Sequence, residues 1–229
     1  EIKDLSVIDF GCGGGWLVNS LAYHHKNLSR IDGVDYNPVA IKYAEQIKRK
    51  LLINSNFYNS DLFTFSSQFK YNLIISLGAL HHTNNCIKAI KTISKYAHKN
   101  SYIFLGLYHK YGRRPFLQHF DKMKEETEEY KFNEYKKLHN IKDEKKLFSW
   151  FRDQVLHPHE TQHTYEEVLP VFKELNFEII STSINDFKPI KNNEDIIKEE
   201  KNLFNYGLKK INKNEYYPGF FIIVAKNKN

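Results

Sequence analysis

The chain has 229 residues, of which 41% are hydrophobic and 15% aromatic, so it can bury a core and is not a disordered segment. Its formal net charge of +7 is spread over short lysine runs that acids interrupt, which suits an anionic small molecule at least as well as a nucleic acid. Two cysteines exclude a disulfide framework, and no apolar run approaches the roughly 18 residues of a membrane span.

The first residue is Glu1 rather than Met, and strand-like sequence starts by Leu5. We therefore expect a further segment to precede Glu1 in the native protein. No signal peptide is visible, so the reducing cytoplasm is the expected compartment. A homodimer is compatible with this composition.

The first half of the chain alternates apolar runs with amphipathic segments. Strands are expected at 5–10, 31–36, 56–58, 71–77 and 102–108, and helices at 16–25, 38–52 and 85–98. Asn37 and Pro38 form a helix start, with Asn as the cap and Pro in the first helical position. This order predicts a parallel sheet that helices cover on both faces.

After residue 108 the regularity breaks. A long charged insertion, 109–163, is expected to be helical and to pack through apolar residues at roughly helical spacing, namely Phe116, Phe120, Met123, Tyr130 and Phe132. We call this insertion the lid. A helix at 164–175, a strand at 177–184 and a strand at 219–225 follow, with a second insertion at 185–218. The sequence thus predicts three parts: 1–108, 109–163 and 164–229.

A glycine-rich turn follows the first expected strand. Asp9, Gly11, Gly13 and Gly15 alternate there, so the backbone can approach a ligand without a Cβ in the way. The following helix offers free N–H groups at its start. Asp35 comes twenty residues after Gly15, at the end of the second strand, where a carboxylate can accept both hydroxyls of a ribose.

The residue after the glycines separates two classes of cofactor. A nicotinamide fingerprint requires a small residue at position 16, where helix and strand pack closely. This chain has Trp16. The turn therefore favours a nucleoside cofactor without a pyrophosphate.

These residues resemble motifs of the class I S-adenosylmethionine (SAM) dependent methyltransferases. Residues 9–15 look like motif I, Asp35 like the acid of motif II, and Asp61 like the acid that contacts the adenine amino group in that family. Tyr36 and Leu62 stand where apolar residues sandwich the adenine ring. Residues 76–83 are similar to the segment after strand four in the ubiquinone/menaquinone methyltransferase-like branch.

The resemblance implies a doubly wound, mostly parallel α/β sheet of seven strands, of the Rossmann-like methyltransferase type, whose last strand is antiparallel. It also implies SAM as cofactor and S-adenosylhomocysteine (SAH) as product. The cofactor-binding set that follows is Asp9, Gly11, Cys12, Gly13, Gly15, Trp16, Asp35, Tyr36, Asp61, Leu62 and Leu77.

The methyl acceptor is less defined. Enzymes that methylate base amines resemble one another in an Asn/Asp-Pro-Pro-aromatic segment after strand four, where this chain has Leu77-Gly78-Ala79-Leu80. The Pro-Cys pair of base C5-methyltransferases is also absent. We therefore expect transfer to an oxygen or nitrogen of a small, anionic metabolite. A tRNA methyltransferase and a SAM-using enzyme of other chemistry remain the alternatives.

Histidines are the candidate bases, because their pKa lies near neutrality. His81 and His82 follow strand four at the edge where such sheets bind ligands, although a loop histidine that caps the next helix fits equally well. His157 and His159 lie in a dense polar segment, for which a catalytic role, a structural anchor and a metal site all remain open. No standard zinc spacing is present, so we expect no metal.

The remaining candidates would hold the acceptor. Paired arginines just past strand five can grip an acid group through bidentate contacts. The expected acceptor-binding residues are Tyr108, Tyr111, Arg113, Arg114, Arg152, Asp153, Gln154 and His163.

Overall fold

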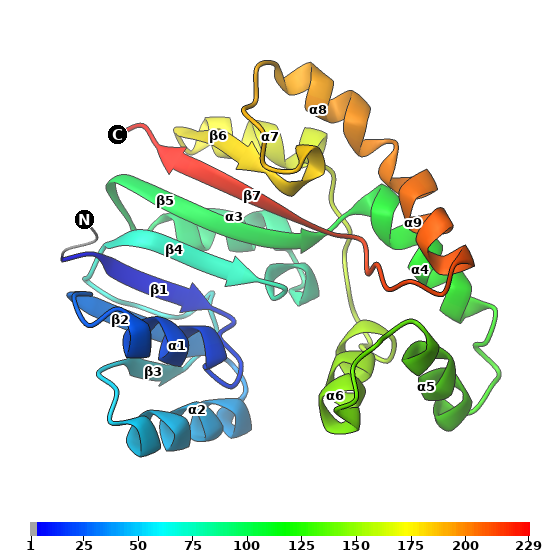
Figure 1. The fold of residues 1–229 in the computed structure, drawn as a ribbon. Helices are drawn as coiled ribbons and strands as arrows, with labels where there is room; N and C mark the ends of the chain where they lie inside the picture. The colour runs from blue at the N-terminus through cyan, green and yellow to red at the C-terminus, as the bar shows by residue number, and fades with distance from the viewer. Residues whose placement is uncertain (1–3) are drawn as a thin grey trace.

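The computed structural model describes residues 4–229, so residues 1–3 of the first expected part lie outside it. Its seven-stranded sheet has the order β3-β2-β1-β4-β5-β7-β6 (Figure 1). Strands β1 to β5 are parallel, and β7 runs antiparallel to both of its neighbours. The strands are β1 (Ser6–Phe10), β2 (Arg30–Asp35), β3 (Asn56–Asn59), β4 (Tyr71–Leu77), β5 (Ala97–Tyr108), β6 (Phe177–Thr182) and β7 (Phe220–Asn227). The expected doubly wound sheet is confirmed.

Helices cover both faces of this sheet. Helices α1 (Trp16–His24) and α2 (Pro38–Leu51) bury Val18, Ala22 and Ile41 against one face. Helices α3 (Cys86–Ser94) and α7 (Tyr165–Glu174) pack on the other face around Phe10, and α8 (Asn193–Glu200) joins them. Two short 3-10 turns, η1 (Leu80–His82) and η2 (Ser183–Asn185), follow β4 and β6. The faces thus hold separate apolar clusters.

Side-chain caps fix where several helices begin. The side chain of Asn37 accepts from the N–H groups of Val39 and Ala40, as the Asn-Pro pair predicts. Asn85 caps α3, and Thr164 caps α7 by accepting from Glu167 N. Helix α3 ends earlier than the expected 85–98, because β5 already begins at Ala97, opposite Tyr71.

The lid residues form three helices at the end of the sheet where the parallel strands terminate (Figure 1). They are α4 (Lys110–Asp121), α5 (Glu128–Lys137) and α6 (Glu144–Gln154), and α9 (Leu203–Asn212) packs against α4. The expected apolar stripe is divided by a turn: Phe116 and Phe120 are buried in α4, Phe132 is half-buried in α5, and Tyr130 is exposed. The second insertion therefore completes the core of the lid. None of the helices within residues 4–229 could span a membrane.

A buried hydrogen bond between His109 and Glu200 joins the start of the lid to α8. His109 Nε2 donates to Glu200 Oε2 over 2.8 Å, and both side chains are fully buried. His109 Nδ1 accepts from the first N–H groups of α4. Glu200 accepts from Tyr165 N over 2.6 Å and from Glu166 N over 3.3 Å, at the start of α7. One pair therefore caps two helices at once.

We expect Glu200→Ala to lower the free energy of unfolding by about 3–5 kcal/mol, because it leaves buried His109 and the start of α7 without a partner. Urea unfolding of the variant measures this loss. Glu199→Ala removes an exposed neighbouring acid and serves as the matched control. Equal midpoints for the two variants would contradict the capping role.

Candidate active site

The glycine turn at the end of β1 has a conformation that needs glycine. Gly11, Gly13 and Gly15 have φ of 76°, 51° and 72°, in the left-handed region. A Cβ at Gly11 would overlap that of Ala79, and one at Gly15 would overlap Ala44 and Phe57. A Cβ at Gly13 would meet nothing within 4 Å. Gly11 and Gly15 are thus packed tightly against neighbouring side chains, whereas Gly13 faces open space from which a ligand can approach.

Asp35 lies across the mouth of this turn. Its Oδ2 accepts from Gly13 N and its Oδ1 from Asn37 N, each over 2.8 Å. The carboxylate is therefore held at the end of β2 by the glycine turn on one side and by the start of α2 on the other. It has the position in which it can accept the hydroxyls of a ribose.

A second acid lies beneath the turn. Asp9 is 5% exposed, and burial, helped by the charge of Asp35, raises its pKa to about 7. A carboxyl with this pKa is partly protonated at neutral pH. Asp9 does not line the open cleft described next.

A cleft of about 700 Å³ opens in front of the glycine turn. Its size and its mixture of apolar and polar walls are typical of small-molecule sites. Of the expected cofactor residues, Gly11, Gly13, Asp35, Tyr36, Asp61 and Leu62 line it. Residues outside the expected cofactor set also line it, namely Asn37, Ala40, Phe63, Gly78, Ala79, Thr83 and Asn84. Two sequence signals pointed to some of these: the Asn37 helix cap and the family-like segment 76–83.

Besides Asp9, four further expected cofactor residues do not line the cleft. Trp16 is 71% exposed and lies with Tyr23 and Tyr43 on the outer surface of α1 and α2. Cys12 is buried in the core, where burial raises the pKa of its thiol. Gly15 and Leu77 pack against neighbouring side chains instead. None of these four residues is therefore placed to contact a ligand in the cleft.

The adjacent histidines after β4 lie in different environments. His81 is fully buried, its Nδ1 accepts from Tyr108 N over 3.2 Å, and its ring packs on the Tyr108 ring. Burial, with nearby positive groups, lowers the pKa of His81 to about 2. His81 therefore stays neutral and supports the end of β5. The expected catalytic role fits His82 instead.

His82 and His157 line the cleft with their rings 3.9 Å apart. His82 Nδ1 donates to the carbonyl oxygen of His159 over 2.9 Å, so the neutral ring carries a lone pair on Nε2. His157 Nδ1 accepts from His159 N over 3.2 Å, so its Nε2 carries the proton. The backbone of one residue, His159, thus holds the two rings in opposite tautomers.

The Nε2 atom of His82 is buried and has no hydrogen-bond partner within residues 4–229. Asp153 Oδ1 lies 3.7 Å from it, too far for a hydrogen bond but close enough to stabilise a positive charge on the ring. Burial lowers the pKa of His82, which keeps the lone pair available near neutral pH. The arrangement can therefore accept a proton inside the cleft.

Arg113 is not free to bind an anionic acceptor. Its fully buried guanidinium donates to both carboxylate oxygens of Glu160, over 3.0 and 2.7 Å, and to the carbonyl oxygens of Gln154 and Pro218. It also stacks 3.8 Å over the ring of Tyr108, which is buried as well. We call residues 154–163 the strap, and this ion pair fixes it to α4.

Other expected acceptor residues also have structural partners. Gln154 Oε1 accepts from Tyr135 and Tyr216, and buried His163 bonds Thr161. Tyr111 packs on His109, and exposed Arg114 faces α9 through Phe204. His159, an expected catalytic residue, contributes its backbone to the two histidines of the cleft, and its own ring bonds Thr83 O.

Two expected acceptor residues do reach open space. Asp153 lines the cleft, and Arg152 lines an outer basin of about 750 Å³. The basin shares Asn37, Asp153 and His157 with the cleft, so the two spaces adjoin. Within residues 4–229 no group of three or more His, Cys, Asp or Glu side chains is arranged to hold a metal ion.

Because the pKa of His81 is about 2 in the folded protein and near 6.5 when unfolded, its contribution to stability is present above pH 6.5 and is lost as pH falls. When the pH falls from 7 to 5, His81 becomes protonated in the unfolded chain only, and we expect this to lower the free energy of unfolding by about 2 kcal/mol. Urea unfolding across that range should show a flatter profile for His81→Gln. The exposed His98→Gln control should keep the wild-type slope, and parallel profiles for all three proteins would contradict the assignment.

Comparison with known proteins gives relatives of one kind. Ubiquinone biosynthesis O-methyltransferase of Rickettsia bellii is 29% identical over 86 residues, which cover 37% of this chain and 34% of that protein. (S)-tetrahydroprotoberberine N-methyltransferase of Eschscholzia californica is 30% identical over 107 residues, 46% of this chain and 30% of that protein. The matches thus span about a third of the length of these curated relatives.

Solved structures share the fold over nearly the whole chain. Magnesium protoporphyrin IX methyltransferase from Synechocystis PCC 6803, solved with bound SAH, has a TM-score of 0.59 at 18% identity, covering 98% of this chain and 74% of that one. PKMT2 from Rickettsia typhi has a TM-score of 0.70 at 16% identity, covering 98% of this chain and 50% of that one. The methyltransferase domain family matches residues 2–217. The chain therefore belongs to the methyltransferase domain family, and S-adenosylmethionine is the cofactor of this class I fold.

Proposed function

We propose that this domain transfers the methyl group of SAM to an oxygen or nitrogen of a small molecule, with a hydroxyl oxygen as the favoured acceptor. The observation that carries the proposal is the unpartnered Nε2 of His82, whose lone pair is buried beside the glycine turn. A hydroxyl needs a base to become a good nucleophile, whereas an amine needs less help. A base held in this tautomer therefore favours a hydroxyl.

The residues at the inner end of the cleft fit the cofactor. Gly13 offers a surface without a Cβ, and the anchored Asp35 carboxylate can accept the ribose hydroxyls. Asp61, Tyr36 and Leu62 line the wall where the family resemblance puts the adenine ring. SAM, when bound, supplies a methyl group that its sulfonium activates.

The chain's own residues then prepare the acceptor. His82 Nε2 receives the hydroxyl proton, and the carboxylate of Asp153 stabilises the imidazolium that forms. His157 offers its Nε2–H as a donor that can orient an oxygen of the acceptor, because its Nδ1 is occupied by His159 N. Asp153 and His157 line this side of the cleft, where the cleft adjoins the outer basin.

Three of the similar proteins have names that support a small acceptor: ubiquinone biosynthesis O-methyltransferase, (S)-tetrahydroprotoberberine N-methyltransferase and magnesium protoporphyrin IX methyltransferase. Another relative is named a putative protein N5-glutamine methyltransferase, so the support is not uniform. The outer basin is lined by Lys145 and Arg152 but also by Glu128 and Asp153, so its charges cancel and do not favour an anionic acceptor over a neutral one. The lid as an acceptor-binding unit, the cytoplasmic location and the homodimer stay predictions.

We expect Asp35→Ala to weaken SAH binding by about 1–3 kcal/mol, because the variant loses the charged acceptor for the ribose and frees the glycine turn. Isothermal titration measures the dissociation constant. Glu178→Ala removes an exposed acid from β6, away from the cleft, and should bind SAH as the wild type does. Unchanged affinity in Asp35→Ala would contradict the cofactor assignment.

We expect His82→Gln to lower kcat by roughly 10²- to 10⁴-fold while leaving the dissociation constant of SAH nearly unchanged, because it removes the base and not a cofactor contact. Labelled SAM with a mixture of small hydroxylated metabolites provides the assay. The acid limb of the wild-type rate profile should lie below pH 6.5, because the pKa of His82 is lowered, and it should vanish in the variant. His98→Gln is the control. Wild-type turnover in His82→Gln would contradict the role of His82 as the base.

A further inference from the structure

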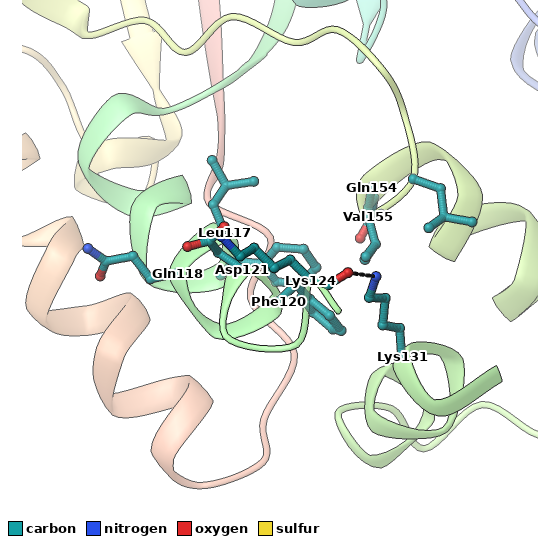
Figure 2. A pocket seen from close by; sticks show the side chains of 10 residues that line it. Leu117, Gln118, Phe120, Asp121, Lys124, Lys131, Gln154 and Val155 are labelled. Carbon is teal, nitrogen blue, oxygen red and sulfur yellow. Dashed lines mark hydrogen bonds between the residues drawn. The ribbon is translucent and has the colours of Figure 1, made fainter. Parts of the chain in front are cut away.

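A second cavity lies inside the lid, separate from the cofactor cleft. It has a volume of about 480 Å³ and lies between α4, the start of α5 and the end of α6 (Figure 2). We call it the lid pocket. Phe116, Leu117 and Phe120 of α4 form one wall, and Val155 and Leu156 form the opposite one. These residues make its interior apolar.

The opening of the lid pocket carries a positive group. Lys131 of α5 is half-buried and reaches across to donate to Lys124 O over 2.8 Å (Figure 2). The ion pairs within residues 4–229 do not include Lys131, and the acid one turn further along α5, Glu134, pairs with Lys137 instead. Two N–H groups of a partly desolvated ammonium are thus left for an anion.

The same stretch of chain borders both cavities. Asp153 and His157 line the cofactor cleft, whereas Gln154, Val155 and Leu156, which lie between them, line the lid pocket. The end of α6 is therefore a shared wall, one chain thick. A molecule that fills the lid pocket has to affect the position of Asp153 and His157 on the other side, because packed interiors transmit small displacements.

We propose that the lid pocket binds an amphipathic monocarboxylate, and that this binding is coupled to ligand binding in the cofactor cleft. The apolar body of the ligand lies between Phe120 and Leu156, and its carboxylate accepts from Lys131 Nζ. Net positive charge at the opening, where Asp121 is the single acid against two lysines, excludes a cationic amphiphile. Binding in the lid pocket requires no methyl transfer, so it can be tested independently of the proposed function.

The experiment uses decanoate and its uncharged counterpart decanamide as probes, with titration calorimetry on the whole chain below their aggregation concentrations. We expect decanoate to bind with one-to-one stoichiometry and at least about 10-fold more tightly than decanamide. Lys131→Gln should remove this preference, and Leu117→Trp should block both probes by filling the pocket. Lys122→Gln removes a neighbouring exposed charge outside the pocket and should bind decanoate as the wild type does.

Coupling is measured as the dissociation constant of SAH with and without saturating decanoate. We expect a change of about 5-fold or more, of either sign, with an equal reciprocal effect of SAH on decanoate. Leu117→Trp should bind SAH and show no response to decanoate. Three results would each overturn the proposal. They are a failure of decanoate to bind saturably, equal affinity of Lys131→Gln and the wild type for decanoate, and a dissociation constant of SAH that is the same with and without decanoate.

Discussion

The buried ion pair between Arg113 and Glu160 is the contact on which the acceptor side of the molecule depends. The N–H groups of a guanidinium that is buried away from water need hydrogen-bond acceptors. Here two carboxylate oxygens and two carbonyl oxygens accept from Arg113. The pair fixes the strap against α4. Because His159 lies in the strap, the same pair also determines where the peptide that orients His82 and His157 is found.

His81, His82 and His109 serve different purposes because their surroundings differ. His81 is enclosed by Tyr108 and remains neutral, so it behaves as a core residue. His109 is equally buried but has a carboxylate partner in Glu200, so it links helices. His82 alone combines burial with an unoccupied nitrogen that faces a cleft. Residue type therefore says little about the role until the partners of both ring nitrogens are known.

The sequence predicted the cofactor half well and the acceptor half poorly, for a physical reason. The features around Gly11, Gly13 and Asp35 are local: a turn needs glycine, and the end of a parallel strand has a known place at the sheet edge. Local periodicity predicted where the strands lie along the chain, and the family resemblance alone implied their arrangement in the sheet. Arg113, by contrast, is defined by Glu160 and Pro218, which are 47 and 105 residues away along the chain. No local pattern encodes such pairing, so the sequence alone suggested that Arg113 binds an anionic acceptor, whereas it forms a buried structural ion pair.

The position of α9 has a consequence for the order in which the protein can be assembled during synthesis. Residues 4–108 contain all the strands that build the cofactor cleft, and each pairs within that contiguous stretch. The lid, in contrast, packs its first helix against α9, and β5 receives its outer partner only from β7 at the end of the chain. Domains form as their contacts become available on the ribosome. The cofactor side can thus mature early, whereas the lid waits for residues 203–227 to emerge.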